Sequence, residues 1–388
     1  MATAPPRLLV LGLGLCLGGC FMTADSSLWQ RPRDGQREQA RDAAVDRPRD
    51  QAADRPRDRQ RERSIDVGPD LVNPSLIREW VQRTTAGPPD CNGPQLAYHA
   101  AQKLVYMYGG YAGGVSACTQ QTWTYDVATT TWTKLCDPCP PGPRYYHGMV
   151  YDSARQVLVL FGGFDGTAQH SDLWELGASG QWQLKPLITT PPPRARFGSA
   201  FDEKRSRLVV FGGQDSTDAL LDNVWEYDGQ KWSGPFAPTV RPLPRRESFA
   251  TFASGTAQAA ALRDKVVVLG GAMSSSGDVV ADDMWTWDGS TWQQLCTTCT
   301  GTARCVAPIG FDRHSGRLIL VGGWRGDDEI AGTMEYAGAW AHMSALPTAR
   351  DSAGLTYDLH RDVFVLFGGN GHGCGSDCDE TWEYVVKP

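Results

Sequence analysis

The fold is decided by stretches such as residues 157–182, which read VLVLFGGFDGTAQHSDLWELGASGQW. An apolar run ends in a glycine pair, a tryptophan follows about a dozen residues later, and a second tryptophan about eight beyond it. The order recurs six times, with glycine pairs at 109–110, 162–163, 212–213, 270–271, 322–323 and 368–369. A repeat of roughly 50 residues with this strand content indicates a radial array of small sheets.

Each copy predicts a four-stranded antiparallel sheet. An aromatic residue, usually followed by Asp as in Tyr151-Asp152, ends the first strand, and the carboxylate is expected to cap the turn that follows. The apolar run is the second strand. It does not alternate with polar residues, so it must be covered on both faces. The tryptophans mark the third and fourth strands, and residues 73–388 therefore predict an all-β, six-bladed β-propeller.

This pattern resembles the kelch repeat over about residues 75 to 388. The copies depart from it in three places: Met334 replaces the first tryptophan of the fifth copy, the fourth has about seven extra residues before Gly270, and the first has Tyr98-His99 instead of aromatic-Asp. The resemblance implies a propeller that binds its ligands around the central channel, on the face carrying the loops between second and third strands.

Closure of the ring is predicted from both ends of the repeat region. The sixth copy stops at residues 382–388, without a fourth strand, whereas Glu79-Trp80-Val81-Gln82 looks like a fourth strand with no blade of its own. We expect residues 76–83 to complete the last blade, which leaves no open sheet edge. Deletion of residues 75–85 is expected to cripple folding.

Residues 1–20 have the features of an export signal. Arg7 precedes a ten-residue apolar stretch from Leu8 to Leu17, which is too short to span a bilayer. Leu17-Gly18-Gly19-Cys20 resembles the bacterial lipobox, which implies lipid attachment at Cys20; an ordinary signal peptide with an incidental cysteine is the alternative. Phe21 after the cysteine favours the outer membrane by that resemblance. The expected location is therefore the bacterial cell envelope.

Residues 21–72 are predicted to be a disordered tether rich in Arg, Asp and Pro, with Arg-Pro-Arg-Asp three times. Residues 25–70 contain 11 Arg against 9 Asp and 2 Glu, and this balance argues against nucleic-acid binding. Setting these residues and Arg7 aside from the chain totals of 37 basic and 44 acidic residues leaves 25 basic and 33 acidic in 71–388. The propeller is therefore acidic, and a charged partner would be basic.

Cysteines are expected to form disulfides in an exported protein. The candidate bridges are Cys136–Cys139, Cys296–Cys299, Cys374–Cys378 and Cys91–Cys118, which leaves Cys305 single. The repeat register places all of these cysteines on one face of the ring. The two Cys-x-x-Cys pairs fall on opposite sides of the ring, so their sulfurs cannot share one zinc tetrahedron.

Candidate ligand residues lie at one template position, two residues after the Arg of Pro-Arg. It is occupied by Gly93, Tyr146, Arg196, Glu247, Val306 and Ser352. Arg196 and Glu247 could serve as acid and base toward a sugar, or form a salt bridge. His147, His170 and His372 are further candidates on this face. The acidic residues of the loops could bind calcium, or they could simply lie in solvent-exposed turns. No other cofactor or metal is expected.

We therefore expect a lipid-anchored, monomeric binding or scaffolding module that recognises a protein or carbohydrate partner at the channel mouth. The alternative is a carbohydrate-active enzyme on the same face, similar to sugar epimerases or to galactose oxidase. Galactose oxidase takes a copper ligand from a further domain, whereas this sequence ends inside its last blade. Fold alone does not fix the function.

Overall fold

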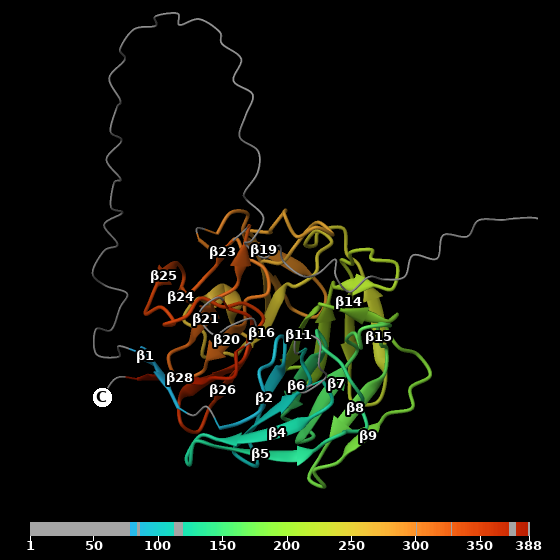
Figure 1. Ribbon diagram of the computed structural model, residues 1–388. Coiled ribbons are helices and arrows are strands. Elements are labelled where there is room, and N and C mark those ends of the chain that lie inside the picture. The colour runs from blue at the N-terminus through green and yellow to red at the C-terminus, as the bar shows by residue number, and fades with distance from the viewer. Residues whose placement is uncertain are drawn as a thin grey trace, which may run out of the picture. The chain divides into compact units, whose positions relative to one another are not determined.

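The computed structural model describes residues 78–83, 86–111, 119–299, 301–326, 328–371 and 378–386. Their long strands form six four-stranded antiparallel sheets, which surround a common centre as the blades of a propeller (Figure 1). The fold predicted from the repeats is confirmed. In this part of the chain the one short helix is the 3₁₀ turn η2 (Ala260–Leu262), and no helix long and apolar enough to cross a membrane occurs.

Blades 1 to 3 follow the chain in order. Blade 1 contains β2 (Gln95–His99), β3 (Leu104–Tyr108), β4 (Thr122–Asp126) and β5 (Thr131–Cys136). Blade 2 contains β6 (Gly148–Asp152), β7 (Val157–Phe161), β8 (Leu173–Leu176) and β9 (Trp182–Leu184). Blade 3 contains β11 (Gly198–Asp202), β12 (Arg207–Phe211), β14 (Val224–Tyr227) and β15 (Trp232–Phe236).

Blades 4 to 6 complete the ring. Blade 4 contains β16 (Phe249–Ala253), β17 (Lys265–Leu269), β18 (Met284–Trp287) and β19 (Trp292–Cys296). Blade 5 contains β20 (Ile309–Asp312), β21 (Arg317–Val321), β24 (Thr333–Tyr336) and β25 (Trp340–His342). Blade 6 contains β26 (Gly354–Asp358), β27 (Val363–Phe367), β28 (Thr381–Val386) and β1 (Arg78–Gln82). Two short ladders pair β10 (Arg194–Ala195) with β13 (Gln214–Asp215), and β22 (Trp324–Arg325) with β23 (Asp328–Glu329).

The antiparallel order gives the ring two distinct faces. Turns from first to second and from third to fourth strands lie on one face, which we call the hairpin face. Loops from second to third strands, and connectors from each fourth strand to the next blade, lie on the other, which we call the mouth face. The six glycine pairs and the two Cys-x-x-Cys pairs therefore lie on the mouth face.

The second strand of each blade is buried on both sides, as its apolar run predicts. In β7, Leu158 and Leu160 pack with Tyr106 and Tyr108 of blade 1. Val159 and Phe161 of the same strand pack with residues of blade 3. Successive side chains of a strand point to opposite faces, so one blade supplies half of each neighbouring core. The core therefore lies between blades and requires a complete ring.

Strand β1 closes that ring. It pairs antiparallel with β28, with Trp80 opposite Tyr384, so the first described strand lies beside the last (Figure 1). The fourth strand expected within residues 76–83 is present as Arg78–Gln82. Its Trp80 side chain donates to Thr333 Oγ1 of blade 5 at 2.8 Å, and Arg78 bonds Asp312 of that blade at 2.6 Å. β1 therefore connects two blades that are far from it in sequence.

The fourth-strand tryptophan repeats this inter-blade contact where the preceding blade offers a hydroxyl. Trp132 donates to Thr381 and Trp182 donates to Thr122, at 2.8 and 2.9 Å. Where the equivalent position is apolar, the indole nitrogen has no hydrogen-bond partner within the described ranges; these are Trp232, Trp292 and Trp340. Hydrogen bonding of these tryptophans thus depends on one residue of the neighbouring blade.

The expected turn caps are present. Asp152 Oδ1 accepts from the backbone N–H of Ala154 and Arg155, both at 3.0 Å, and Asp202, Asp312 and Asp358 cap their turns in the same way. In blade 1, His99 Nδ1 substitutes for the carboxylate by accepting from Gln102 N–H. The extra residues of blade 4 form a longer hairpin loop that contains η2 and buries Leu262.

Removing the buried cation of β1 should weaken the closure. Arg78 is 4% exposed and pairs with Asp312, which is fully buried. Arg78→Met leaves that carboxylate without this partner, and we expect the free energy of unfolding to fall by about 3 kcal/mol. Urea unfolding measures the change. Gln82→Met, at an exposed position of the same strand, is the control and should stay within about 0.5 kcal/mol of wild type; equal losses in both variants would contradict the role of Arg78.

Candidate functional site

The six residues that share the template position after Pro-Arg meet around one cavity of about 190 Å³. The cavity lies where the first strands converge on the centre of the ring, and it is also lined by residues of β2, β6, β11, β16, β20 and β26. We call these six residues the mouth ring: Gly93, Tyr146, Arg196, Glu247, Val306 and Ser352. Residues more than 250 positions apart in sequence are thus brought to one opening.

The mouth ring has an unusual backbone that is the same in every blade. All six residues have positive φ, from 49° at Val306 to 68° at Gly93. This left-handed conformation costs a non-glycine residue roughly 1–2 kcal/mol. In five links around the ring, the N–H of one residue donates to the carbonyl of the ring residue on the preceding blade; one example is Arg196 N–H to Tyr146 O at 2.9 Å. These bonds join neighbouring blades around the channel.

The side chains divide the mouth ring into two halves. On blades 2 to 4, the Arg196 guanidinium lies 3.9 Å from the centre of the Tyr146 ring and forms an ion pair with Glu247. Burial lowers the pKa of Arg196, but Tyr146 and Glu247 outweigh this effect and raise it, so the group stays charged. On blades 1, 5 and 6, the ring residues are the smaller Gly93, Val306 and Ser352. One half is therefore fixed and charged, and the other is lined by short side chains.

A buried arginine supports the mouth ring in five blades. In each, its Nη1 donates to the carbonyl of the first glycine of the glycine pair, at 2.7 to 3.3 Å; the arginines are Arg144, Arg194, Arg245, Arg304 and Arg350. In blade 1, Cys91 takes this place and contacts Gly109 O at 3.5 Å. Because each arginine lies two residues before a ring residue, it fixes the connector on which that residue stands.

Two of these arginines also bind a carboxylate that orients the third-strand tryptophan. Asp172 accepts from Arg144 Nη1 at 2.9 Å and from Trp174 Nε1 at 2.6 Å. Asp283 does the same for Arg245 and Trp285. The Pro-Arg pattern located the equivalent positions in the repeat, but it did not predict the hydrogen bonds that these arginines make. The recurrence of an acid two residues before the tryptophan was the signal that could have found it.

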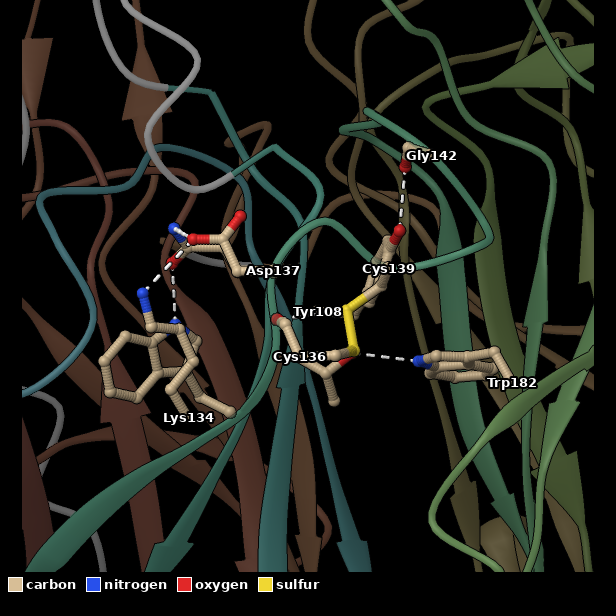
Figure 2. The surroundings of a disulfide bond; sticks show 10 residues. Tyr108, Lys134, Cys136, Asp137, Cys139, Gly142 and Trp182 are labelled. Carbon is tan, nitrogen blue, oxygen red and sulfur yellow. Dashed lines mark hydrogen bonds and ion pairs between the residues drawn. A yellow bond between two sulfur atoms is a disulfide. The ribbon is translucent and has the colours of Figure 1, made fainter.

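Two of the expected disulfides lie on the mouth face. Cys136 bonds Cys139, and Cys296 bonds Cys299, with Cα–Cα distances of 5.5 and 5.7 Å. Figure 2 shows the first bridge beside Trp182 of blade 2, whose indole donates to Thr122 Oγ1. Nearby, the Tyr108 hydroxyl donates to Gly142 O at 2.8 Å. Each bridge thus closes a four-residue loop at the start of the connector from a fourth strand to the next blade.

The remaining cysteines are partly described. Cys91 and Cys378 are each in a disulfide, whereas their expected partners, Cys118 and Cys374, lie outside the described residues. Cys305 is a free, buried thiol. Burial and the nearby carboxylates of Glu247 and Asp351 raise its pKa, so it is a poor nucleophile at neutral pH.

His147 is one of the residues that line the central cavity, and its ring also packs against Tyr108 of blade 1. It is 3% exposed, and neither ring nitrogen has a hydrogen-bond partner within the described ranges. Its ring lies edge-on to Tyr108 at 5.6 Å, as Phe197, at the same template position, lies 5.6 Å from Phe161. Burial lowers the pKa of His147 well below 6.5. The site therefore favours the neutral imidazole.

The other metal candidates do not come together. His170 Nε2 bonds Asp165 at 3.1 Å, inside one loop of blade 2. The carboxylate of Asp165 also accepts from Thr167 and Ala168 of the same loop. His372 lies outside the described residues. Across the described ranges, no group of three His, Cys, Asp or Glu side chains is arranged to hold a metal ion.

A second set of residues, which the sequence analysis did not predict, is directly adjacent to the mouth ring. In it, the residue before each ring residue pairs with the residue after the glycine pair, as Tyr145 does with Phe164. Tyr145 lies 5.4 Å from Tyr111, 5.0 Å from Tyr146 and 5.5 Å from Phe164, measured between ring centres. These four residues form an aromatic cluster over blades 1 and 2. An aromatic residue directly follows three of the six glycine pairs, and this was the available signal; these residues are Tyr111, Phe164 and Trp324.

Comparison with known proteins agrees with this architecture. The profile of the KLHDC2/KLHL20/DRC7 Kelch-repeats domain matches residues 75–253. Mei4-dependent protein 6 of Schizosaccharomyces pombe is 29% identical over 96 residues, covering 23% of this chain. The Leucine-zipper-like transcriptional regulator 1 homolog of Drosophila melanogaster is 29% identical over 133 residues, covering 30%. The chain spans only 13% of the length of either relative.

Six four-stranded blades around a common centre define a β-propeller. Its double glycines and paired tryptophans, together with the profile match over residues 75–253, make the chain similar to kelch-repeat β-propellers. Propellers of this family generally serve as protein-binding modules or scaffolds.

His147 makes stability depend on pH. The unfolded chain takes up a proton near pH 6.5, but the native state does not, so the free energy of unfolding falls as the pH drops below about 6.5. We expect His147→Phe, which copies Phe197, to remove about 2 kcal/mol of the loss between pH 7 and pH 5. Urea unfolding at both pH values measures it. His314→Phe, at an exposed histidine, should keep the wild-type slope; an unchanged slope in His147→Phe would refute the assignment.

Proposed function

We propose that the chain is a lipid-anchored binding or scaffolding module of a bacterial cell envelope, which recognises a protein or glycan partner through its mouth face. The observation that carries the proposal is the mouth ring. Six equivalent residues surround one cavity, and those of blades 2 to 4 present a fixed tyrosine, arginine and glutamate. Concave sites with aromatic walls and a few oriented polar groups are typical of ligand recognition.

Strand β1 begins on the face of the ring opposite to the mouth ring. Arg78 begins β1 and bonds Asp312 and Asp362, which belong to turns of the hairpin face. The chain therefore enters the propeller on the face opposite to the mouth ring. The anchor proposed at Cys20 precedes this end of the propeller in sequence.

A carbohydrate-active enzyme is the competing function. Arg196 and Glu247 are the acid–base candidates, and they bind each other. Because each group is held by the other, the geometry favours a structural ion pair over a free acid and a free base. Turnover of a sugar, or copper bound in equimolar amount, would overturn the binding proposal.

The mouth proposal can be tested on peptide and glycan arrays. We compare the wild type with Arg196→Met/Glu247→Met, because removing both charges together avoids leaving one buried alone. Binding of any wild-type ligand should fall at least tenfold, since central contacts dominate recognition energy. Lys204→Met, on the hairpin face, is the matched control and should bind normally. If both variants bind every wild-type ligand as tightly as wild type, the mouth ring is not the recognition site.

The anchor is tested separately in bacteria that express the full chain. Wild type should stay in the envelope fraction until detergent is added, and its mature N-terminal peptide should carry acyl chains by mass spectrometry. Cys20→Ser should be released into the soluble fraction or secreted, with an unmodified mass. Cys16→Ser is the control and should behave as wild type. A soluble, unacylated wild type would contradict the anchor without affecting the mouth proposal.

A further inference from the structure

Exposed large apolar residues are distributed unevenly over the propeller. In the described part of the chain there are eight: Tyr111, Leu135, Leu184, Ile188, Val240, Leu243, Val279 and Leu359. Leu359 lies in a turn of the hairpin face, and the other seven lie toward the mouth face. Single exposed apolar residues need no explanation, but a group of them on one face indicates an interaction surface.

Six of these residues are aliphatic and stand on the mouth face, and none of them lines the central cavity. Leu135 and Leu184 lie at the mouth-face ends of fourth strands in blades 1 and 2. Ile188 lies in the connector to blade 3, Val240 and Leu243 in the connector to blade 4, and Val279 in a loop of blade 4. We call these six residues the aliphatic rim. It extends over four consecutive blades.

The connectors present their apolar side chains in restricted conformations. Residues 185–193 read KPLITTPPP and residues 237–244 read APTVRPLP, so both are rich in proline. Proline fixes the backbone φ angle and limits the states of its neighbours. Ile188 is fully exposed, and Leu243 is 63% exposed. Side chains held outward by a restricted backbone lose less entropy on binding, which favours a docking role.

Carboxylates on the same blades give this surface its charge. Asp165, Asp215, Asp218 and Asp278 stand in the loops of blades 2, 3 and 4. Side-chain hydrogen bonds from Ser274 and Ser276 lower the pKa of Asp278, so it is ionised at neutral pH. Nearby cations are already used: Lys134 pairs with Asp137, Lys185 with Glu175, and Arg241 with Asp222. The rim is therefore apolar and flanked by negative charge.

We propose that the partner recognised by the mouth face is a protein segment that carries aliphatic side chains flanked by lysine or arginine, and that it docks on the aliphatic rim of blades 1 to 4. The inference rests on the proposed function and chooses between its two ligand classes. Aliphatic side chains offer no hydrogen bonds to sugar hydroxyls, and none of the six rim residues lines the central cavity. A protein covers about 800 Å² per partner, which suits a surface of this extent, and basic flanks complement the net charge of the propeller.

The test uses synthetic 12-residue peptides in three sets with equal aliphatic content, flanked by Lys and Arg, by Asp and Glu, or by Ser and Gly. Wild type should bind the basic set most tightly, and more weakly at high salt. Ile188→Ser/Leu243→Ser should lower that affinity at least tenfold. Leu359→Ser is the matched control, an equally simple change at the exposed leucine of the hairpin face, and should change affinity less than twofold.

Several results would overturn the inference: preference for the acidic or uncharged set, binding of no peptide, or equal losses in the rim and control variants. Failure of the inference and failure of the proposed function are distinguishable. If glycan binding is lost in Arg196→Met/Glu247→Met but kept in the rim variant, the mouth ring remains the recognition site and the protein-segment inference falls. If neither variant changes any binding, the protein-segment inference and the proposed mouth-face function are both wrong.

Discussion

The pairing of β1 with β28 is the interaction on which the rest of the structure depends. Each second strand buries its two sides against the two neighbouring blades, so no blade has a complete core alone. An array with a missing fourth strand would leave blade 6 with an unpaired edge and blade 5 without Arg78 and Trp80. Pairing with β1 covers the edge of β28 and completes the last inter-blade core; β1 is then the outer strand of blade 6, as the fourth strand is in the other blades.

Closure also creates the candidate site. Once six blades surround a centre, the start of every first strand points to the same opening, and the mouth ring follows from the repeat. All six positions share the positive φ values, and five of the links between neighbouring blades share the backbone hydrogen bond, irrespective of side chain. Buried arginines hold the connectors in five blades, whereas Cys91 does so in the first. The scaffold is therefore constant, and the identity of the ring residues is what varies.

Much of this fold follows from the sequence because its determinants are local and repeated. Glycine pairs, apolar runs and tryptophans lie within one blade, so their register predicts blades, faces and the closing strand. Contacts between blades were harder to predict from the sequence. Whether Trp132 finds Thr381, or Trp232 finds no partner, depends on residues that belong to different copies. The aromatic cluster and the aliphatic rim escaped prediction for the same reason, since their members come from separate loops that only the closed ring brings together.

Native-state hydrogen exchange of β1 tests ring closure most directly. If β1 is an integral strand, opening it exposes the cores of blades 5 and 6. The amides of β1 that face β28, such as that of Val81, should therefore exchange only with the global unfolding free energy, as those of β27 do. The account predicts equal protection for Val81 and Val365. Exchange of Val81 through a local opening, while Val365 stays fully protected, would show that the ring holds together without β1 and would contradict the account.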